Sequence, residues 1–317
     1  PRRNFGGAGR APRDRPFGGK SPAAPDRRAG GTEGGRKLSK LYVNRYSMGS
    51  GRKRHAWRRW LGVFFAICLL AAGGLAASIA IFPPEGVLIL EYHKVNDWSD
   101  DSYTVPTADF AAQLDELSAR GYTTISLLDF LRAKKGKQKL PDKPVILTFD
   151  DGYLDNYTDM LPLLEARGMK ATVFMVTNDI GLPGYLTWDA LRDMQERGIE
   201  IGSHTANHLP LTGMPPSEAE KEVKLSKLLL EWNGIRTVFG FSYPNGSYAD
   251  YISAILKRNE YLAAVTGDPG LNTMDTDPYL LQRINIPRPR LGLTEFRLRL
   301  FKADLCDRLG LWRHRIK

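Results

Sequence analysis

The chain has 317 residues, of which 42% are hydrophobic and 25% are charged, a composition typical of a globular protein with one or two domains. Its formal net charge of +10 is unevenly distributed. Residues 1–59 contain 17 Lys and Arg against 3 Asp and Glu, a net charge of +14, whereas the rest of the chain carries −4. The basic character therefore belongs to the N-terminal tail, and nucleic-acid binding is not expected of the folded part.

The N-terminal region predicts a membrane anchor. Residues 1–59 are expected to form a disordered, basic, cytoplasmic tail, because large apolar side chains are few in its first 36 residues. Residues 60–82 contain no charged side chain and are long enough to cross a bilayer as one transmembrane helix. Basic residues flank only the N-terminal side of this segment, which predicts a single-pass protein of the cell membrane with an extracytoplasmic body. A cleaved signal peptide, with a small-residue site at residues 78–80, is the alternative.

From residue 83 onward, short apolar runs alternate with amphipathic segments, which indicates a parallel sheet covered by helices. Strands are predicted at residues 87–92, 122–125, 145–149, 171–176, 199–202, 237–241, 261–266 and 281–286. Helices are predicted at residues 107–120, 126–134, 157–167, 187–197, 217–232, 249–257 and 294–305, with N-caps at Thr107, Ser126 and Ser217. Seven or eight strands predict an α/β fold, a (β/α) barrel that is distorted or incomplete. An open doubly wound sheet is the alternative.

The residues best suited to catalysis or metal binding share one feature. Each of them follows a predicted strand. His93 follows the first strand, Asp150 and Asp151 follow the third, and His204 and His208 follow the fifth. The carboxyl ends of parallel strands in a barrel converge on one face, where active sites lie. These five side chains are therefore expected to meet.

Their chemistry favours a metal-dependent hydrolase. Two imidazoles four residues apart, with one carboxylate, form a three-ligand site for zinc or a similar ion and leave a position open for water or substrate. Such an ion activates the water and polarises a carbonyl group. A second carboxylate can act as general base, and a further histidine can protonate the leaving amine of an amide. Each motif alone is often structural, but the combination favours catalysis.

Two segments carry a specific resemblance. The sequences TFDDGY at residues 148–153 and HTANH at residues 204–208 resemble the first two motifs of the polysaccharide deacetylases, carbohydrate esterase family 4. The resemblance covers residues 87–290 and implies that residues 83–317 form a polysaccharide deacetylase catalytic domain. It further implies one catalytic base, Asp150, and three metal ligands, Asp151, His204 and His208. Zinc is favoured, with cobalt, nickel or manganese as alternatives, since affinity alone does not select the metal.

Two further segments refine the resemblance. YHKV at residues 92–95 resembles the permuted branch that includes the poly-N-acetylglucosamine deacetylases, which implies that His93 is the general acid. FSYPNG at residues 241–246 resembles the third motif, which implies three substrate-binding residues, Tyr243, Pro244 and Asn245. By position, the backbone N–H of Asn245 is expected to bind the oxyanion.

The sequence also departs from the family pattern. Many members carry an arginine two residues before the proline of the third motif, where it orients the base, and this chain has Ser242 there. Either another arginine, such as Arg283 or Arg288, takes its place, or Asp150 is tuned differently. A fourth motif containing an aspartate is not evident, which fits the permuted branch.

The resemblance implies hydrolysis of N-acetyl groups from an extracytoplasmic polysaccharide that contains N-acetylglucosamine, with release of acetate. The expected partners are this polysaccharide, in the cell wall or a biofilm, and the membrane through one helix. Two alternatives remain: an O-acetyl esterase with the same site, and a glycan-binding protein whose site has lost activity. The sequence leaves open which glycan is used and the oligomeric state.

Overall fold

The computed structural model describes residues 51–81 and 86–312. The first of these segments is one helix, α1 (Gly51–Ile81). Within it, Trp57–Gly74 is long and apolar enough to cross a membrane by length and composition, and its side chains are not buried. The basic residues 51–59, expected in the tail, belong to this helix, because Arg, Lys and Ala are good helix formers and extend it. The rest of the expected tail lies outside the described residues.

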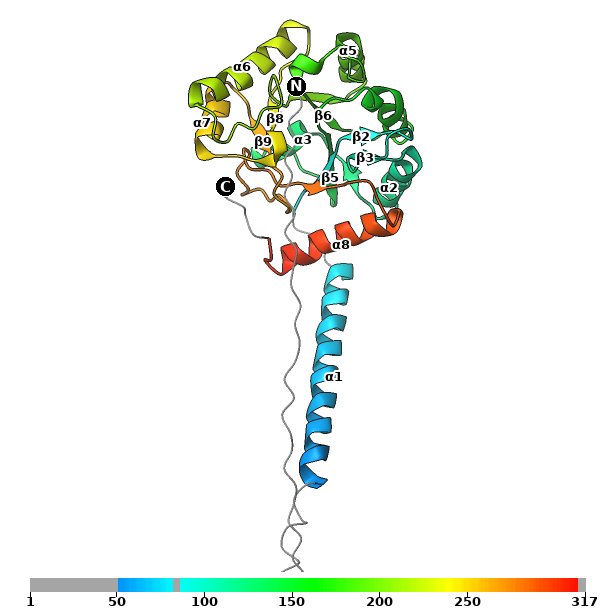
Figure 1. Ribbon diagram of the computed structural model, residues 1–317. Helices are drawn as coiled ribbons and strands as arrows, with labels where there is room; N and C mark the ends of the chain where they lie inside the picture. Colours follow the sequence, from blue (N-terminus) through cyan, green and yellow to red (C-terminus); the bar gives the residue numbers. More distant parts are fainter. Residues whose placement is uncertain (1–50, 82–85, 313–317) are drawn as a thin grey trace, which may run out of the picture. The chain divides into compact units, whose positions relative to one another are not determined.

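The body is built on a curled parallel sheet, which confirms the expected distorted (β/α) barrel (Figure 1). Its strands are β1 (Leu88–Tyr92), β4 (Thr123–Thr124), β5 (Pro144–Phe149), β6 (Thr172–Met175), β7 (Glu200–Ser203), β8 (Gly240–Ser242), β9 (Ala263–Val265) and β10 (Ile284–Asn285). They follow the order β10-β1-β5-β6-β7-β8-β9, and β4 pairs with β5. A parallel bridge between Val265 and Leu281 joins the two ends of the sheet at one point. The short strands β2 (Lys94–Val95) and β3 (Thr104–Val105), which sequence patterns do not predict, form a separate pair.

Helices surround the sheet (Figure 1). They are α2 (Thr107–Ala119), α3 (Leu127–Lys134), α4 (Leu161–Glu165), α5 (Trp188–Glu196), α6 (Pro216–Trp232), α7 (Asp250–Arg258) and α8 (Leu293–Arg308). Helix α3 has the predicted N-cap, Ser126, and it forms a capping box in which Ser126 and Asp129 bond each other's backbone N–H. Two other predicted caps are wrong. Pro106 and Pro215 occupy the N-cap positions of α2 and α6, so Thr107 and Ser217 lie inside the first turn of each helix.

Side chains that point into the barrel change character along each strand. Alternate residues of a strand share one face, and on β1 the inward series begins with Ile89 and continues with Glu91. On β5 it begins with Ile146 and continues with Thr148. Ile89 and Ile146 belong to an apolar cluster with α3 residues, whereas Glu91 lies against the pocket at the carboxyl ends. Apolar side chains therefore fill the amino end of the barrel, and polar side chains line its carboxyl end.

Candidate active site

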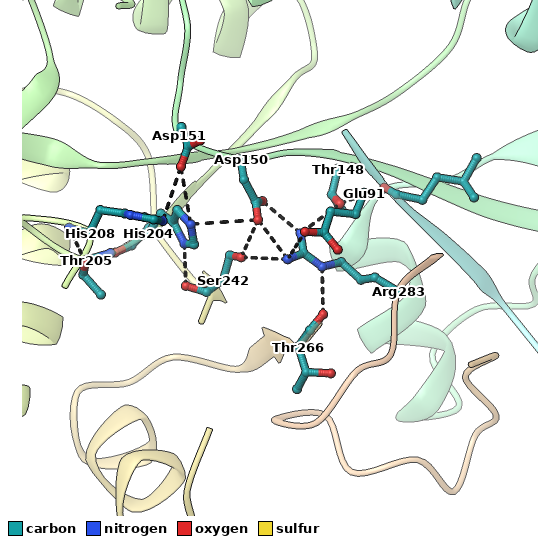
Figure 2. Close-up of polar contacts among 12 residues, drawn as sticks. Glu91, Thr148, Asp150, Asp151, His204, Thr205, His208, Ser242, Thr266 and Arg283 are labelled. Carbon is teal, nitrogen blue, oxygen red and sulfur yellow. Dashed lines mark hydrogen bonds and ion pairs between the residues drawn. The ribbon is translucent and has the colours of Figure 1, made fainter. Parts of the chain in front are cut away.

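The five predicted site residues do meet at the carboxyl ends of the strands. One pocket of about 530 Å³ is lined by His93, Asp150, Asp151, His204 and His208, together with residues of neighbouring loops. Figure 2 shows Asp150 between the histidine pair and a buried arginine, and Asp151 beside the two histidines. His93 and His204, 111 positions apart along the chain, thus share one pocket, because parallel strands bring them to the same edge of the sheet.

Asp151, His204 and His208 form a compact set of donor atoms. Oδ1 of Asp151 lies 3.6 Å from Nε2 of His204 and 3.5 Å from Nε2 of His208. Ligand atoms of one tetrahedral zinc ion, each about 2.0–2.1 Å from the metal, are roughly 3.3 Å apart. The spacing of the three donors therefore fits one divalent ion, with one coordination position left for water or substrate.

The tautomer of His204 also suits a metal ligand. Its Nδ1 lies 2.7 Å from the backbone carbonyl of Ser242. Because a carbonyl oxygen only accepts, Nδ1 carries the hydrogen and Nε2 presents its lone pair to the aspartates. Burial lowers the pKa of His204, which favours the neutral ring that metals bind.

The loop that carries the histidines is held from below by α6. Glu222 accepts hydrogen bonds from the backbone N–H groups of Ala206 and Asn207 and from the Asn207 side chain. Thr205 adds a turn, since its hydroxyl accepts from the N–H of His208 at 2.9 Å. Hydrogen bonds to α6 and one hydrogen bond within the loop therefore fix the position of the loop.

Backbone strain is concentrated at this site. Five non-glycine residues of the described chain have positive φ, and four belong to the site or its loops: Asp151 (71°), Thr205 (70°), His208 (55°) and Asn245 (56°). Such conformations cost free energy and persist where the surrounding structure imposes them, which is common at functional sites. Asp151 and His208 both adopt such a conformation, and their side chains approach each other to 3.5 Å.

Asp150 is held by a fully buried arginine. Nη1 and Nη2 of Arg283 donate to the two carboxylate oxygens at 2.9 and 2.8 Å, and the hydroxyl of Ser242 donates at 2.9 Å (Figure 2). Burial opposes ionisation of Asp150 and is the largest single influence, but the charge and hydrogen bonds of Arg283 together with the neighbouring histidines outweigh it and hold the pKa of the carboxyl group well below its usual range. Asp150 is therefore an ionised carboxylate at neutral pH.

Arg283 takes the place left by Ser242. The two side chains are in contact, with Nη2 of Arg283 3.2 Å from the Ser242 hydroxyl. Nε of Arg283 donates to the carbonyl of Thr266 at 3.0 Å, which fixes the guanidinium plane. Arg288, the other arginine considered, instead donates to the carbonyl of Ser99. An arginine immediately before β10 thus reaches the carboxylate of Asp150.

Sequence reasoning missed Glu91. Its carboxylate lies 3.3 Å from Nη2 of Arg283, and burial raises its pKa although Arg283 opposes the shift. Donor atoms of Glu91, His93 and Asp150 all lie within 4.8 Å of one another. The available signal was an acidic residue at an inward position of a buried strand, two residues before His93.

The third motif contributes less side-chain surface than expected. Tyr243 is fully buried and its hydroxyl donates to the carbonyl of Tyr279, and Pro244 is buried beneath the same wall. Only Asn245 of the three lines the pocket. Tyr243 and Pro244 do not line the pocket, because Tyr243 packs into the apolar core and Pro244 is buried, so their predicted role in substrate binding stays a prediction. The stacked rings of Tyr153 and Tyr185, 5.2 Å apart, form another part of the pocket lining.

A second pocket of about 840 Å³ adjoins the first. Both are lined by Asn245, Gly246, Gly267 and Asn285. Gly246 and Gly267 touch through their backbones: a Cβ built on Gly246 would lie 2.3 Å from Cα of Gly267. The divide between the pockets therefore carries no side chain at these two positions, which leaves a continuous surface for an extended ligand.

Comparisons with known proteins agree with this geometry. Residues 137–264 match the family model described as polysaccharide deacetylase. YxkH of Bacillus subtilis, which is named for the polysaccharide deacetylases, is 35% identical over 211 residues, or 67% of this chain and 75% of that protein. The poly-beta-1,6-N-acetyl-D-glucosamine N-deacetylase of Staphylococcus epidermidis is 27% identical, over 64% of this chain and 80% of that protein.

A solved structure shares the fold as well as the sequence. Streptococcus pyogenes deacetylase PplD, in complex with acetate, superimposes with a TM-score of 0.63 and 28% identity, over 69% of this chain and 98% of that one. Sequence, fold and the arrangement of the pocket thus agree. The chain belongs to the polysaccharide deacetylases, the hydrolases of carbohydrate esterase family 4.

Proposed function

We propose that this chain is a metal-dependent N-deacetylase of an extracytoplasmic polysaccharide that contains N-acetylglucosamine, held in the cell membrane by residues 60–82. The observation that carries the proposal is one pocket that combines three metal-binding donors, an arginine-held carboxylate and a histidine. The name of the S. epidermidis relative supports the choice of glycan.

Asp151, His204 and His208 would hold the ion, which when bound supplies a Lewis acid for the acetyl carbonyl and for water. Asp150 flanks this set, with Oδ2 3.9 Å from Nε2 of His204. Because Arg283 keeps it ionised, Asp150 can accept a proton from the attacking water. The two hydrogen bonds from Arg283 also restrict rotation of the Asp150 side chain.

His93 lies in the same pocket and is the general acid of the proposal. Hydrolysis of an amide requires a proton on the departing nitrogen, and a histidine is the side chain that most often donates one in catalysis. The imidazole of His93 packs beside Tyr103, with ring centroids 4.9 Å apart. Asn245 lies in the pocket wall, and in this proposal its backbone N–H would bind the oxygen on which charge develops.

The test is acetate release from N-acetylglucosamine oligomers by the full chain in detergent, stripped of metal and resupplied with zinc or cobalt. Release should depend on metal and should fall about 10²–10⁴-fold in Asp150→Asn, which removes the base. Asp142→Asn, an exposed aspartate outside the pocket, is the matched control and should retain activity. Absence of release with either metal from folded protein would contradict the proposal.

The same assay separates amide from ester hydrolysis. His93→Gln should lower acetate release from N-acetyl oligomers strongly, because an amine leaves only when protonated. Release from an O-acetylated glycan should change little, because an alkoxide is a better leaving group. Equal losses on both substrates would show that His93 does not act as the acid for the amine.

A further inference from the structure

Helix α8 is apolar on two opposite faces. Phe296, Leu300 and Ala303 are buried against the body. On the opposite side, Leu298, Phe301 and Leu309 are 55%, 46% and 51% exposed. A helix that packs on a core normally places polar residues on its other side. The second apolar face of α8 is therefore unexplained by the fold.

The exposed Leu298, Phe301 and Leu309 form a stripe with the half-buried Leu305 between them. Positions 298, 301, 305 and 309 recur at the helical period and define what we call the outer face of α8. Leu291 and Leu311, exposed at 66% and 58%, extend it beyond both ends of the helix. Contiguous exposed apolar surface of this kind marks an interaction site.

Basic side chains border the stripe on both sides. Lys302 is exposed on one border and Arg297, which pairs with Glu116, lies on the other. An apolar stripe with Lys and Arg along its edges is the pattern of helices that lie in a membrane interface, where the cations meet lipid phosphates. The pattern favours lipid over the purely apolar groove of a protein partner.

The chain itself restricts the body to a membrane surface if α1 spans a bilayer. Helix α1 ends at Ile81 and the described body resumes at Gly86, a connection of at most about 18 Å. Strand β1, which follows directly, pairs with β10, and β10 is the strand that leads into α8. The tether therefore enters the body at the strand next to β10, and the Asn285 carbonyl of β10 accepts a hydrogen bond from Arg299 of α8. Such confinement makes even weak contacts with lipid effective.

We propose that the outer face of α8 lies on the lipid surface, with its apolar side chains at the boundary between headgroups and acyl chains. The proposal rests on the membrane anchor proposed above. Because Arg299, Lys302 and Cys306 of α8 also line the second pocket, the docked helix would hold that pocket beside the lipid surface. The enzyme would then engage its glycan at the membrane.

The experiment uses the full chain in vesicles of phosphatidylcholine and phosphatidylglycerol. Cys68→Ala and Cys306→Ala remove the two cysteines, and a fluorophore is attached through Leu298→Cys. A probe about 5–10 Å deep in the interface should lose about half of its emission with brominated lipids. The matched control is Leu225→Cys, 57% exposed on α6, whose emission should not change.

A second variant tests whether the apolar side chains of the outer face cause the quenching. With the fluorophore at Leu309→Cys, the added substitution Phe301→Glu should restore the emission, whereas Leu225→Glu should leave the quenching in place. Both changes affect exposed side chains, so the midpoint of thermal unfolding should be the same in both.

Two results would overturn the inference. A probe at position 298 that iodide quenches from the water, while brominated lipid does not, shows an exposed face without lipid. A probe that neither agent quenches shows a protein surface over the stripe, from a second copy or from this chain. Extraction of the full chain from membranes by alkaline carbonate tests the anchor separately, so failure of the anchor and failure of α8 docking give different results.

Discussion

At the scale of single residues, the site depends on one guanidinium group that serves two buried carboxylates. Arg283 is 1% exposed and contacts both Asp150 and Glu91. Removal of one partner from such a set leaves uncompensated buried charge, which costs about 3–5 kcal/mol. Arg283→Met should therefore lower the free energy of unfolding by about this amount near neutral pH, as measured by denaturant unfolding in detergent.

The pH dependence of that loss has a defined sign. Asp150 has a folded-state pKa below its unfolded value, so its ion pair stabilises the fold above the ordinary aspartate pKa of about 4 and loses this effect as the pH falls further. The difference in the free energy of unfolding between wild type and Arg283→Met should thus become smaller below about pH 4. Arg288→Met, which removes a bond to the Ser99 carbonyl, is the control. A deficit that is independent of pH would rule out the electrostatic cause.

At the scale of elements, the loop after β8 depends on a close backbone contact. Gly246 has φ of 65° and a Cβ there would meet the backbone of Gly267 at 2.3 Å. Gly246→Ala should displace the loop and the neighbouring Asn245, and kcat/KM should fall at least about tenfold, which is 1.4 kcal/mol. Gly213→Ala also has positive φ but meets nothing within 4 Å, so it isolates the conformational cost of about 1 kcal/mol. Equal activity of the two variants would contradict the role of the contact.

The elements also show what sequence patterns can and cannot predict. Inward-facing residues and turn signals are local, so the strands, most helices and the meeting of His93, Asp150 and His204 were predictable. The identity of the arginine was not, because Arg283 lies 133 residues from Asp150 and only the closure of the sheet brings them together. Glu91 had a local signal in its inward position on a buried strand, but its contact with Arg283 was likewise out of reach of local patterns.

Local geometry limited the helix predictions. Residues 157–167 were expected as one helix, but a π-helical turn at Asn156–Met160 precedes α4. Its Asn156 side chain donates to the carbonyl of His93 and to the carboxylate of Asp155. A π-turn is common at functional sites, and here it brings Asn156 to the backbone of His93. Apolar periodicity does not report such a contact.

At the scale of the whole molecule, the two adjoining pockets predict a preference for polymer over single sugars. The proposed reaction centre occupies the first pocket, and the second offers further surface across the divide at Gly246 and Gly267. Each additional sugar bound there that contributes about 1.4 kcal/mol raises kcat/KM about tenfold. The wild-type chain should therefore hydrolyse a pentasaccharide more efficiently than a disaccharide, as measured by acetate release.

A blocking substitution separates this effect from the chemistry. Ser247 lines the second pocket and does not line the first, so Ser247→Phe should fill the second pocket and remove the advantage of the pentasaccharide. Hydrolysis of the disaccharide should stay within about twofold of wild type, because surface changes away from the reacting groups cost under about 0.5 kcal/mol. Ser118→Phe, at an exposed position of α2, is the matched control. If Ser247→Phe slows both substrates equally, the second pocket does not bind neighbouring sugars, and the length preference must come from the first pocket alone.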